Sequence, residues 1–156
     1  MSWIPKERVV VPVDFSDGSI AAVQTALSLV ADATHLHIIH VLPPMLDYEA
    51  GLVWTNLHDE ARVQQAQQTL RERLPEDRYQ GYHLSIVVGD PGHEIADFAA
   101  DIQAELIVLP SHGRTGISRL LVGSVAERVV RLAHCPVLVL KDGEPPEPDL
   151  RRKLKG

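Results

Sequence analysis

The sequence predicts a single-domain α/β protein with a three-layer architecture, in which an open, twisted, five-stranded parallel sheet carries helices on both faces. Short apolar segments that suit buried strands alternate along the chain with longer segments in helical spacing. The strand segments are apolar on both faces, which is typical of parallel strands covered on two sides. A length of 156 residues suits one domain with one sizeable core.

The expected elements alternate from the amino terminus onward. Runs rich in Val, Ile and Leu predict strands at 9–13, 35–42, 82–88, 106–109 and 137–140. Helical spacing and good helix formers predict helices at 18–32, 56–74 and 120–133, and a further helix that begins at Asp90-Pro91 with Asp as N-cap. Residues 43–55 are expected to be irregular. The segment 142–156 is rich in Pro and charge and predicts a flexible tail, which leaves 1–141 as the folded domain.

Composition excludes several classes of protein. A net charge of −6 and a pI of about 5.7 argue against general nucleic-acid binding, which needs a basic face. The single cysteine, Cys135, permits no intrachain disulfide, fits a reducing cytoplasm and is expected to be buried and inert. No apolar run reaches 18 residues, so no membrane span is expected.

Two turns that follow strands and precede helices are the expected places for chemistry. One spans 12–19 after the first strand, and the other spans 110–124 after the fourth. If the strand order is 3-2-1-4-5, the first and fourth strands are neighbours across the switch point of the sheet. Ligands of such sheets bind at the carboxyl ends of the strands at that point, so the two turns would line one cleft.

The second turn has features of an anion site. Gly113 and Gly116 allow close approach of a ligand to the backbone. Ser124 and Glu127 have the spacing of a capping box, which predicts a helix that starts at Gly123-Ser124 with free N–H groups that favour an anion. On spacing alone, phosphate binding and an ordinary helix start are equally open. The two standard nucleotide motifs, G-x-x-x-x-G-K-[ST] and G-x-G-x-x-G, are absent.

Several segments together resemble the universal stress protein family. They read VVPVDFS at 10–16, SHGRTG at 111–116, GSVAERV at 123–129 and HCPVLV at 134–139. The resemblance covers about residues 6–141, and the order and spacing of these segments make it specific. It implies an adenine nucleotide alpha hydrolase-like fold with strand order 3-2-1-4-5. It also implies a stress-response protein that binds ATP, or ADP or AMP, and that forms a homodimer through the edge strand Val137–Leu140.

The resemblance also implies a binding site. The motif G-x-x-G-x9-G-[ST] matches Gly113 as its second glycine and Gly123-Ser124 as its end. Asp14 corresponds to the acidic residue near the ligand and near a Mg²⁺ or Mn²⁺ ion held mainly by phosphates. The full set of binding residues expected on these grounds is Pro12, Val13, Asp14, Val41, Pro110, Ser111, Gly113, Arg114, Gly123, Ser124 and Val125.

One position departs from the family pattern. Pro110 stands where the motif has its first glycine, and proline lacks an N–H and has a fixed φ. The first hypothesis is an ATP-binding dimeric signalling module. Because of Pro110, a nucleotide-free regulatory dimer is the alternative. A weak ATP hydrolase that uses Asp14 and Arg114 is a further alternative, although nothing in the sequence requires a catalyst.

Overall fold

The computed structural model describes residues 3–45, 54–112 and 122–141. The predicted tail at 142–156 lies outside these residues, as does most of the turn that contains Gly113, Arg114 and Gly116.

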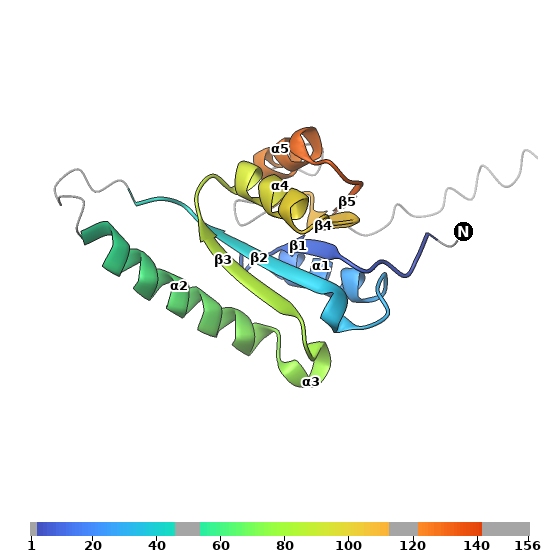
Figure 1. Ribbon diagram of the computed structural model, residues 1–156, viewed down its shortest axis with the longest axis horizontal. Helices are drawn as coiled ribbons and strands as arrows, with labels where there is room; N and C mark the ends of the chain where they lie inside the picture. The colour runs from blue at the N-terminus through green and yellow to red at the C-terminus, as the bar shows by residue number, and fades with distance from the viewer. Residues whose placement is uncertain (1–2, 46–53, 113–121, 142–156) are drawn as a thin grey trace, which may run out of the picture.

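The five strands form one sheet in the predicted order. Their bounds are Val9–Pro12 (β1), Leu36–Leu42 (β2), His83–Val88 (β3), Leu106–Pro110 (β4) and Val137–Leu140 (β5). The order across the sheet is β3-β2-β1-β4-β5, and every neighbouring pair is parallel. The predicted fold class is therefore confirmed, and β1 and β4 lie side by side at the centre (Figure 1).

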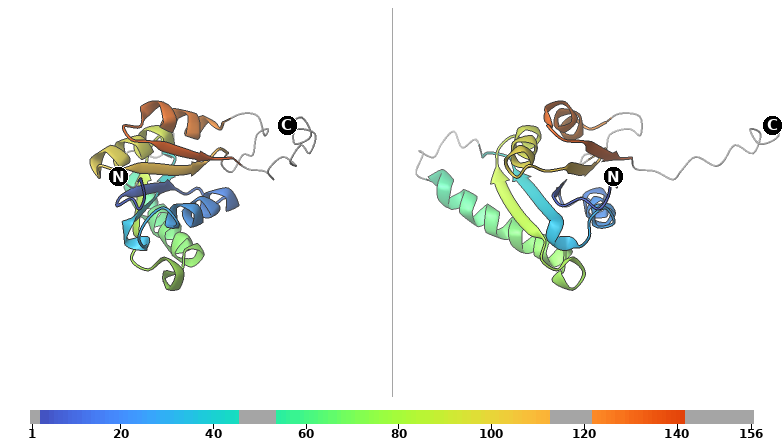
Figure 2. Two further views of the ribbon diagram at one scale, coloured as in Figure 1. Left: turned by 90° about the vertical axis from the view of Figure 1, so that its right-hand side faces the viewer. Right: turned by 45° about the vertical axis from the view of Figure 1, so that its right-hand side comes forward.

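Helices cover both faces of the sheet, as Figures 1 and 2 show. Those of the described chain are Asp17–Leu27 (α1), Trp54–Arg73 (α2), Glu76–Tyr79 (α3), Pro91–Asp101 (α4) and Ser124–Leu132 (α5), with a short 3-10 turn at Ala33–His35 (η1). None of the described helices is long and apolar enough to cross a membrane.

Two hydrophobic cores result, one on each face of the sheet. On β2, Leu36 and Ile38 face the core that includes Leu70 of α2, whereas Ile39 faces the core that includes Ile95 of α4. Successive residues of a strand point to opposite faces, so this alternation shows that a buried parallel strand must be apolar throughout. The alternation explains why the strands could be predicted from runs of apolar residues.

The predicted helix at 18–32 is wrong at its carboxyl end. α1 ends at Leu27, with Ser28 as its C-cap. Val30 instead forms an isolated parallel bridge with Lys6, and the Asp32 side chain accepts a hydrogen bond from the Thr34 N–H to start η1. Local side-chain hydrogen bonds of this kind compete with a continuing helix.

Two other expectations are corrected, and one further element was not predicted. The helix expected at 120–133 begins only at Ser124, because Val122 and Gly123 lie outside it. The single turn of α3 after Pro75 was not predicted, since four residues carry too little periodicity. Cys135 is half-buried rather than buried, and burial raises the pKa of its thiol, which keeps the thiol protonated at neutral pH.

Candidate functional site

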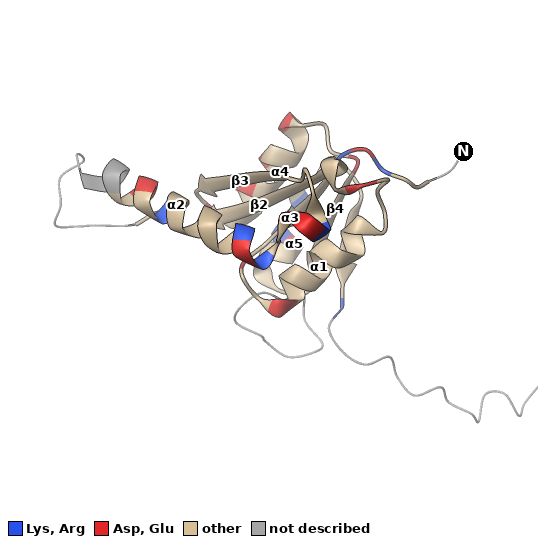
Figure 3. Cartoon of the chain, turned by 90° about the horizontal axis from the view of Figure 1, so that it is seen from below, with Lys and Arg blue, Asp and Glu red and all other residues tan. Residues whose placement is uncertain are grey.

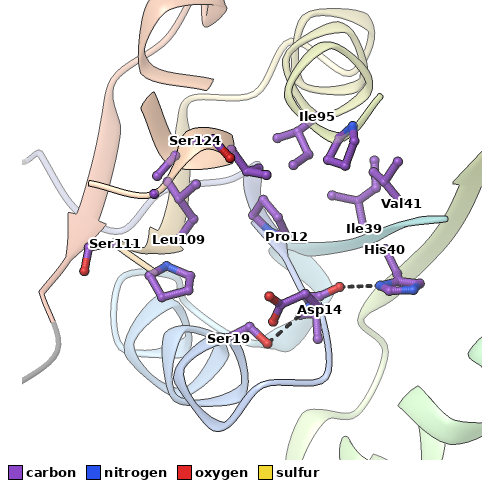
Figure 4. Close-up of a pocket in the computed structure, with 16 residues that line it drawn as sticks. Pro12, Asp14, Ser19, Ile39, His40, Val41, Ile95, Leu109, Ser111 and Ser124 are labelled. Carbon is purple, nitrogen blue, oxygen red and sulfur yellow. Dashed lines mark hydrogen bonds between the residues drawn. The ribbon is translucent and has the colours of Figure 1, made fainter. Parts of the chain in front are cut away.

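A cavity lies at the carboxyl end of the sheet, where β1 and β4 meet. Its volume is about 210 Å³, and its walls come from the carboxyl ends of β1, β2 and β4 and from the amino ends of α4 and α5 (Figure 4). The chain leaves β1 toward α1 on one face and leaves β4 toward α5 on the other. This divergence opens a crevice at the switch point of the strand order, which is where ligands bind in sheets of this type.

The residues predicted from the sequence gather around this cavity. Its lining includes Pro12, Val13, Asp14, Val41, Pro110, Ser111, Gly123, Ser124 and Val125. Gly113 and Arg114 lie outside the described residues. The two turns that the sequence analysis singled out are therefore brought together, and what each residue contacts in a ligand stays a prediction.

The turn after β1 is held by its own hydrogen bonds. The Asp14 carboxylate accepts from the Ser16 N–H at 3.1 Å and from the Ser16 hydroxyl at 2.5 Å. Ser16, rather than Asp14, caps α1 by accepting from the Ser19 N–H at 3.2 Å. The Asp14 N–H in turn donates to the Ser19 hydroxyl at 3.2 Å. Asp14 is thus relieved of capping and lies in the wall of the cavity (Figure 4).

A buried histidine fixes the other side of this turn. His40 is 7% exposed, and its Nδ1 donates to the Val13 carbonyl at 2.5 Å. Because a carbonyl can only accept, Nδ1 carries the proton in this contact. The Phe15 ring packs edge-on against the His40 imidazole, with 4.5 Å between the ring centroids. The backbone that precedes and follows Asp14 is therefore anchored to β2.

The predicted capping box at the start of α5 is wrong. Gly123 is the N-cap, the helix begins at Ser124, and no side chain of the described residues caps it. Glu127 pairs with Arg131 at 2.6 Å rather than with the start of the helix. The Gly123 N–H donates to the Ser111 carbonyl at 2.7 Å, and a Cβ at Gly123 would lie only 3.0 Å from that oxygen. This close contact favours glycine as the N-cap in place of serine.

The same arrangement gives α5 the properties of an anion site. Ser124 and Val125 line the cavity at the first turn of the helix. Backbone N–H groups of a first helical turn have no acceptor within the helix, and the helix dipole makes that end positive. Because no side chain within the described ranges serves as a cap, these groups can bind an anionic ligand.

The amino end of α4 forms the facing wall. Asp90 caps α4 through the His93 N–H at 3.2 Å, which confirms the predicted helix start at Asp90-Pro91. Its carboxylate also contacts His93 Nδ1 and the Arg128 guanidinium, each at 2.8 Å. These hydrogen bonds, those of His93 first, lower the pKa of Asp90 to about 2. The contact with Arg128 ties α4 to α5 beside the cavity.

Pro110 is accommodated within the sheet. It is the last residue of β4 and pairs in register with Leu140 of β5. The N–H groups of Ile107 and Ser111 donate to β5, at the carbonyls of Pro136 and Leu140. Because N–H groups alternate between the two neighbouring strands, the missing N–H of Pro110 would have faced β1. The proline therefore removes no hydrogen bond from the β4–β5 pair.

A second proline faces Pro110 from β1. The Val13 N–H donates to β2, so by the same alternation the position of Pro12 faces β4. The pairing between β1 and β4 extends only as far as the residue pair Val10 and Ile107. The next donors that this ladder would require belong to Pro12 and Pro110, and neither has an N–H. The two prolines thus end the ladder where the cavity begins.

Several lining residues were missed by the sequence analysis. They are Ser19, Ile39, His40, Pro91, Ile95, Leu109 and Ala126. Ile39 and His40 are close in sequence to Val41, and Leu109 is next to Pro110. Their positions near the ends of predicted strands therefore indicated in part that they would lie at the site. Pro91 and Ile95 lie in a helix whose position over the cavity depends on the three-dimensional packing.

The described residues contain no group of three or more His, Cys, Asp or Glu side chains that could hold a metal ion. Among the candidates, Asp14 is the carboxylate that lines the cavity. Mg²⁺ in nucleotide sites is commonly held by one or two carboxylates plus phosphate oxygens. Asp14 therefore fits a metal only together with a phosphate-bearing ligand.

Comparisons with known proteins agree with this geometry. A sequence model described as the universal stress protein family matches residues 6–141. Universal stress protein MJ0531 of Methanocaldococcus jannaschii is 35% identical over 141 residues, which are 86% of this chain and 82% of that protein. The solved structure of MJ0577 from the same organism superposes with a TM-score of 0.76 at 26% identity, covering 91% of this chain and 100% of that one.

A third similarity concerns the fold alone. A universal stress protein solved in complex with cAMP superposes with a TM-score of 0.64 at 23% identity, covering 89% of this chain and 99% of that one. The solved neighbours share the adenine nucleotide alpha hydrolase-like fold that the family resemblance implied.

Proposed function

The chain belongs to the universal stress protein family, and from this premise we propose that it binds an adenine nucleotide, principally ATP, in the cavity between β1 and β4. One observation carries the proposal: an apolar cavity at the switch point adjoins the amino end of α5, which no side chain in the described part of the chain caps. Such a site gives the adenine base an apolar surface, and it gives the phosphates backbone N–H groups that have no acceptor within the helix.

The base and the ribose suit the side of the cavity formed by β1 and β2. Ile39 and Val41 supply apolar surface there, and Ile95 covers it from α4. The Asp14 carboxylate can accept hydrogen bonds only, so ribose hydroxyls are suitable partners. The volume of about 210 Å³ is below the roughly 300–1,000 Å³ of pockets that enclose a whole drug-sized ligand. It therefore suits the nucleoside part, with the phosphates outside it.

The phosphates suit the side formed by α5. The first turn at Ser124 and Val125 provides backbone donors and the Ser124 hydroxyl. Gly113 and Arg114 are expected to add a close backbone approach and a positive charge. A Mg²⁺ or Mn²⁺ ion would be held mainly by the phosphates, with Asp14 as the protein carboxylate. ADP and AMP would use the same nucleoside pocket with fewer phosphate contacts.

Calorimetric titration with ATP, with and without Mg²⁺, tests this proposal. We expect saturable heat at submillimolar ATP and a rise in Tm, because a ligand that binds only the folded state stabilises it. A protein that shows neither heat nor a shift in Tm at millimolar ATP would exclude the proposal. Adenosine and inorganic triphosphate, titrated separately, then distinguish recognition of the nucleoside from binding of phosphate alone.

The alternative of a nucleotide-free protein depends on Pro110, and the geometry argues against it. The β4–β5 pair accommodates the proline, and Pro12 already prevents a full β1–β4 ladder. We expect the affinity of Pro110→Gly for ATP to lie within about threefold of the wild-type value. If the wild-type protein binds no ATP and Pro110→Gly does, the proline blocks the site and the regulatory role without nucleotide is preferred.

Turnover is not part of the proposal. The hydrolase alternative needs a group that activates water, and no side chain of the described residues is held in that role. We propose instead that nucleotide occupancy is read by other proteins as a signal in a stress response. A cytoplasmic location belongs to this proposal and rests on the single cysteine.

The proposed signalling unit is a homodimer. β5 lies at the edge of the sheet with β4 as its neighbour, and its four residues, all apolar, are each partly exposed. An unpaired apolar edge tends to pair with another chain. Light scattering at micromolar concentration tests this assembly, and a monomeric mass would exclude it.

A further inference from the structure

The turn between β1 and α1 contains a strained residue. Phe15 has a φ of +66°, in the left-handed region that bulky side chains seldom adopt. A residue in such a conformation costs free energy and persists only when its surroundings fix it. Phe15 follows Asp14 directly, so whatever holds Phe15 also determines where the Asp14 carboxylate points.

Arg73, the last residue of α2, holds this turn from outside the cavity. Its Nη1 donates to the Phe15 carbonyl, and its Nη2 donates to Asp17 Oδ1 at 3.1 Å. The basic carboxyl end of α2 therefore lies beside the acidic amino end of α1 (Figure 3). Arg73 does not line the cavity, and it reaches the site only through the backbone of the turn.

The chemistry of this contact favours arginine. The guanidinium presents several N–H donors in a rigid fork, so one side chain can hold the Phe15 carbonyl and Asp17 together. The Asp17 carboxylate is fully exposed, so its ion pair with Arg73 contributes little by itself. The contact with the Phe15 carbonyl is the one that acts on the strained peptide. A lysine ammonium, which is a flexible point charge, would not reproduce the fork.

We propose that Arg73 is a positioning residue of the nucleotide site, which keeps the β1–α1 turn in the strained form that directs Asp14 into the cavity. This inference rests on the proposed function. It also couples α2 to the site, because Arg73 sits at the end of that helix. A displacement of the carboxyl end of α2 would release Phe15 and weaken nucleotide binding without touching the ligand.

Variants at Arg73 test the proposal against a neighbouring arginine. Arg71 lies two residues earlier on α2 and pairs with Glu76 at 3.8 Å, so Arg71→Gln is the matched control. We expect ATP affinity to fall about tenfold in Arg73→Gln, which is about 1.4 kcal/mol, to fall by less in Arg73→Lys, and to stay unchanged in Arg71→Gln. Equal affinity in Arg73→Gln and the wild type would overturn the proposal.

A second variant separates positioning from general stability. Glycine adopts positive φ without strain, so Phe15→Gly should make the turn less dependent on Arg73. In the Phe15→Gly background we expect Arg73→Gln to lower ATP affinity by less than about threefold. A merely structural role would give the same loss of affinity in both backgrounds, and that result would also overturn the proposal.

Hydrogen exchange gives a readout that needs no nucleotide. The N–H groups of Ser16 and Ser19 are bonded within the turn, so both should exchange faster in Arg73→Gln and not in Arg71→Gln. If the wild-type protein binds no ATP but exchange changes as expected, the proposed function fails while the contact between Arg73 and the turn stands. Unchanged exchange overturns the inference itself, whatever the binding result.

Discussion

Replacing Gly123 with valine should weaken ATP binding by about a hundredfold. A Cβ at this position would lie 3.0 Å from the Ser111 carbonyl oxygen, which already accepts the Gly123 N–H at 2.7 Å. A branched side chain must therefore push the start of α5 away from the end of β4. Overpacking of this kind costs roughly 1–3 kcal/mol, and it displaces the N–H groups on which phosphate binding depends.

The comparison variant is Gly89→Ala, at the end of β3. A Cβ there would overlap Oε1, Cγ and Cδ of Glu94, a flexible side chain that can change rotamer without moving the backbone. We expect Gly89→Ala to keep both its Tm and its ATP affinity near the wild-type values in calorimetry and thermal melting. Wild-type affinity in folded Gly123→Val would show that the start of α5 does not hold the phosphates.

The fold was predictable because its signals are local and repeated. Each strand is apolar on both faces, and both hydrophobic cores draw on alternate residues of the same strands, as Ile38 and Ile39 show. The helix start at Asp90-Pro91 combines a side-chain cap with a proline, and both act within one turn. With the strand order that the family resemblance implied, the cleft between β1 and β4 followed from topology.

The details that failed depend on contacts remote in sequence. A Ser-x-x-Glu spacing suggested a capping box at Ser124, but the Ser111 carbonyl lies so close that Gly123 takes the N-cap position. The helix expected to continue through Val30 ends at Leu27, and Val30 pairs instead with Lys6, which is far away in the chain. The contact of His40 with the Val13 carbonyl, beside Asp14, is visible only in three dimensions.

Two adjacent isoleucines of β2 should separate the stability of the fold from the function of the site. Ile38 and Ile39 are both fully buried, but Ile38 faces the core under α1 and α2, whereas Ile39 faces α4 and lines the cavity. Truncation of either to alanine should lower the free energy of unfolding by about 2–5 kcal/mol. Urea unfolding of both variants measures this loss.

Only Ile39→Ala should also weaken ATP binding, by about five- to tenfold, because the base loses part of its apolar wall. Ile38→Ala should keep the wild-type affinity at temperatures where it remains folded, since its side chain points away from the cavity. The pair is matched in residue type, burial and strand, so a difference in affinity between the variants reports on which face of β2 meets the ligand. Equal loss of affinity in both variants would mean that ATP binding depends on the stability of the sheet rather than on contact with the Ile39 side chain.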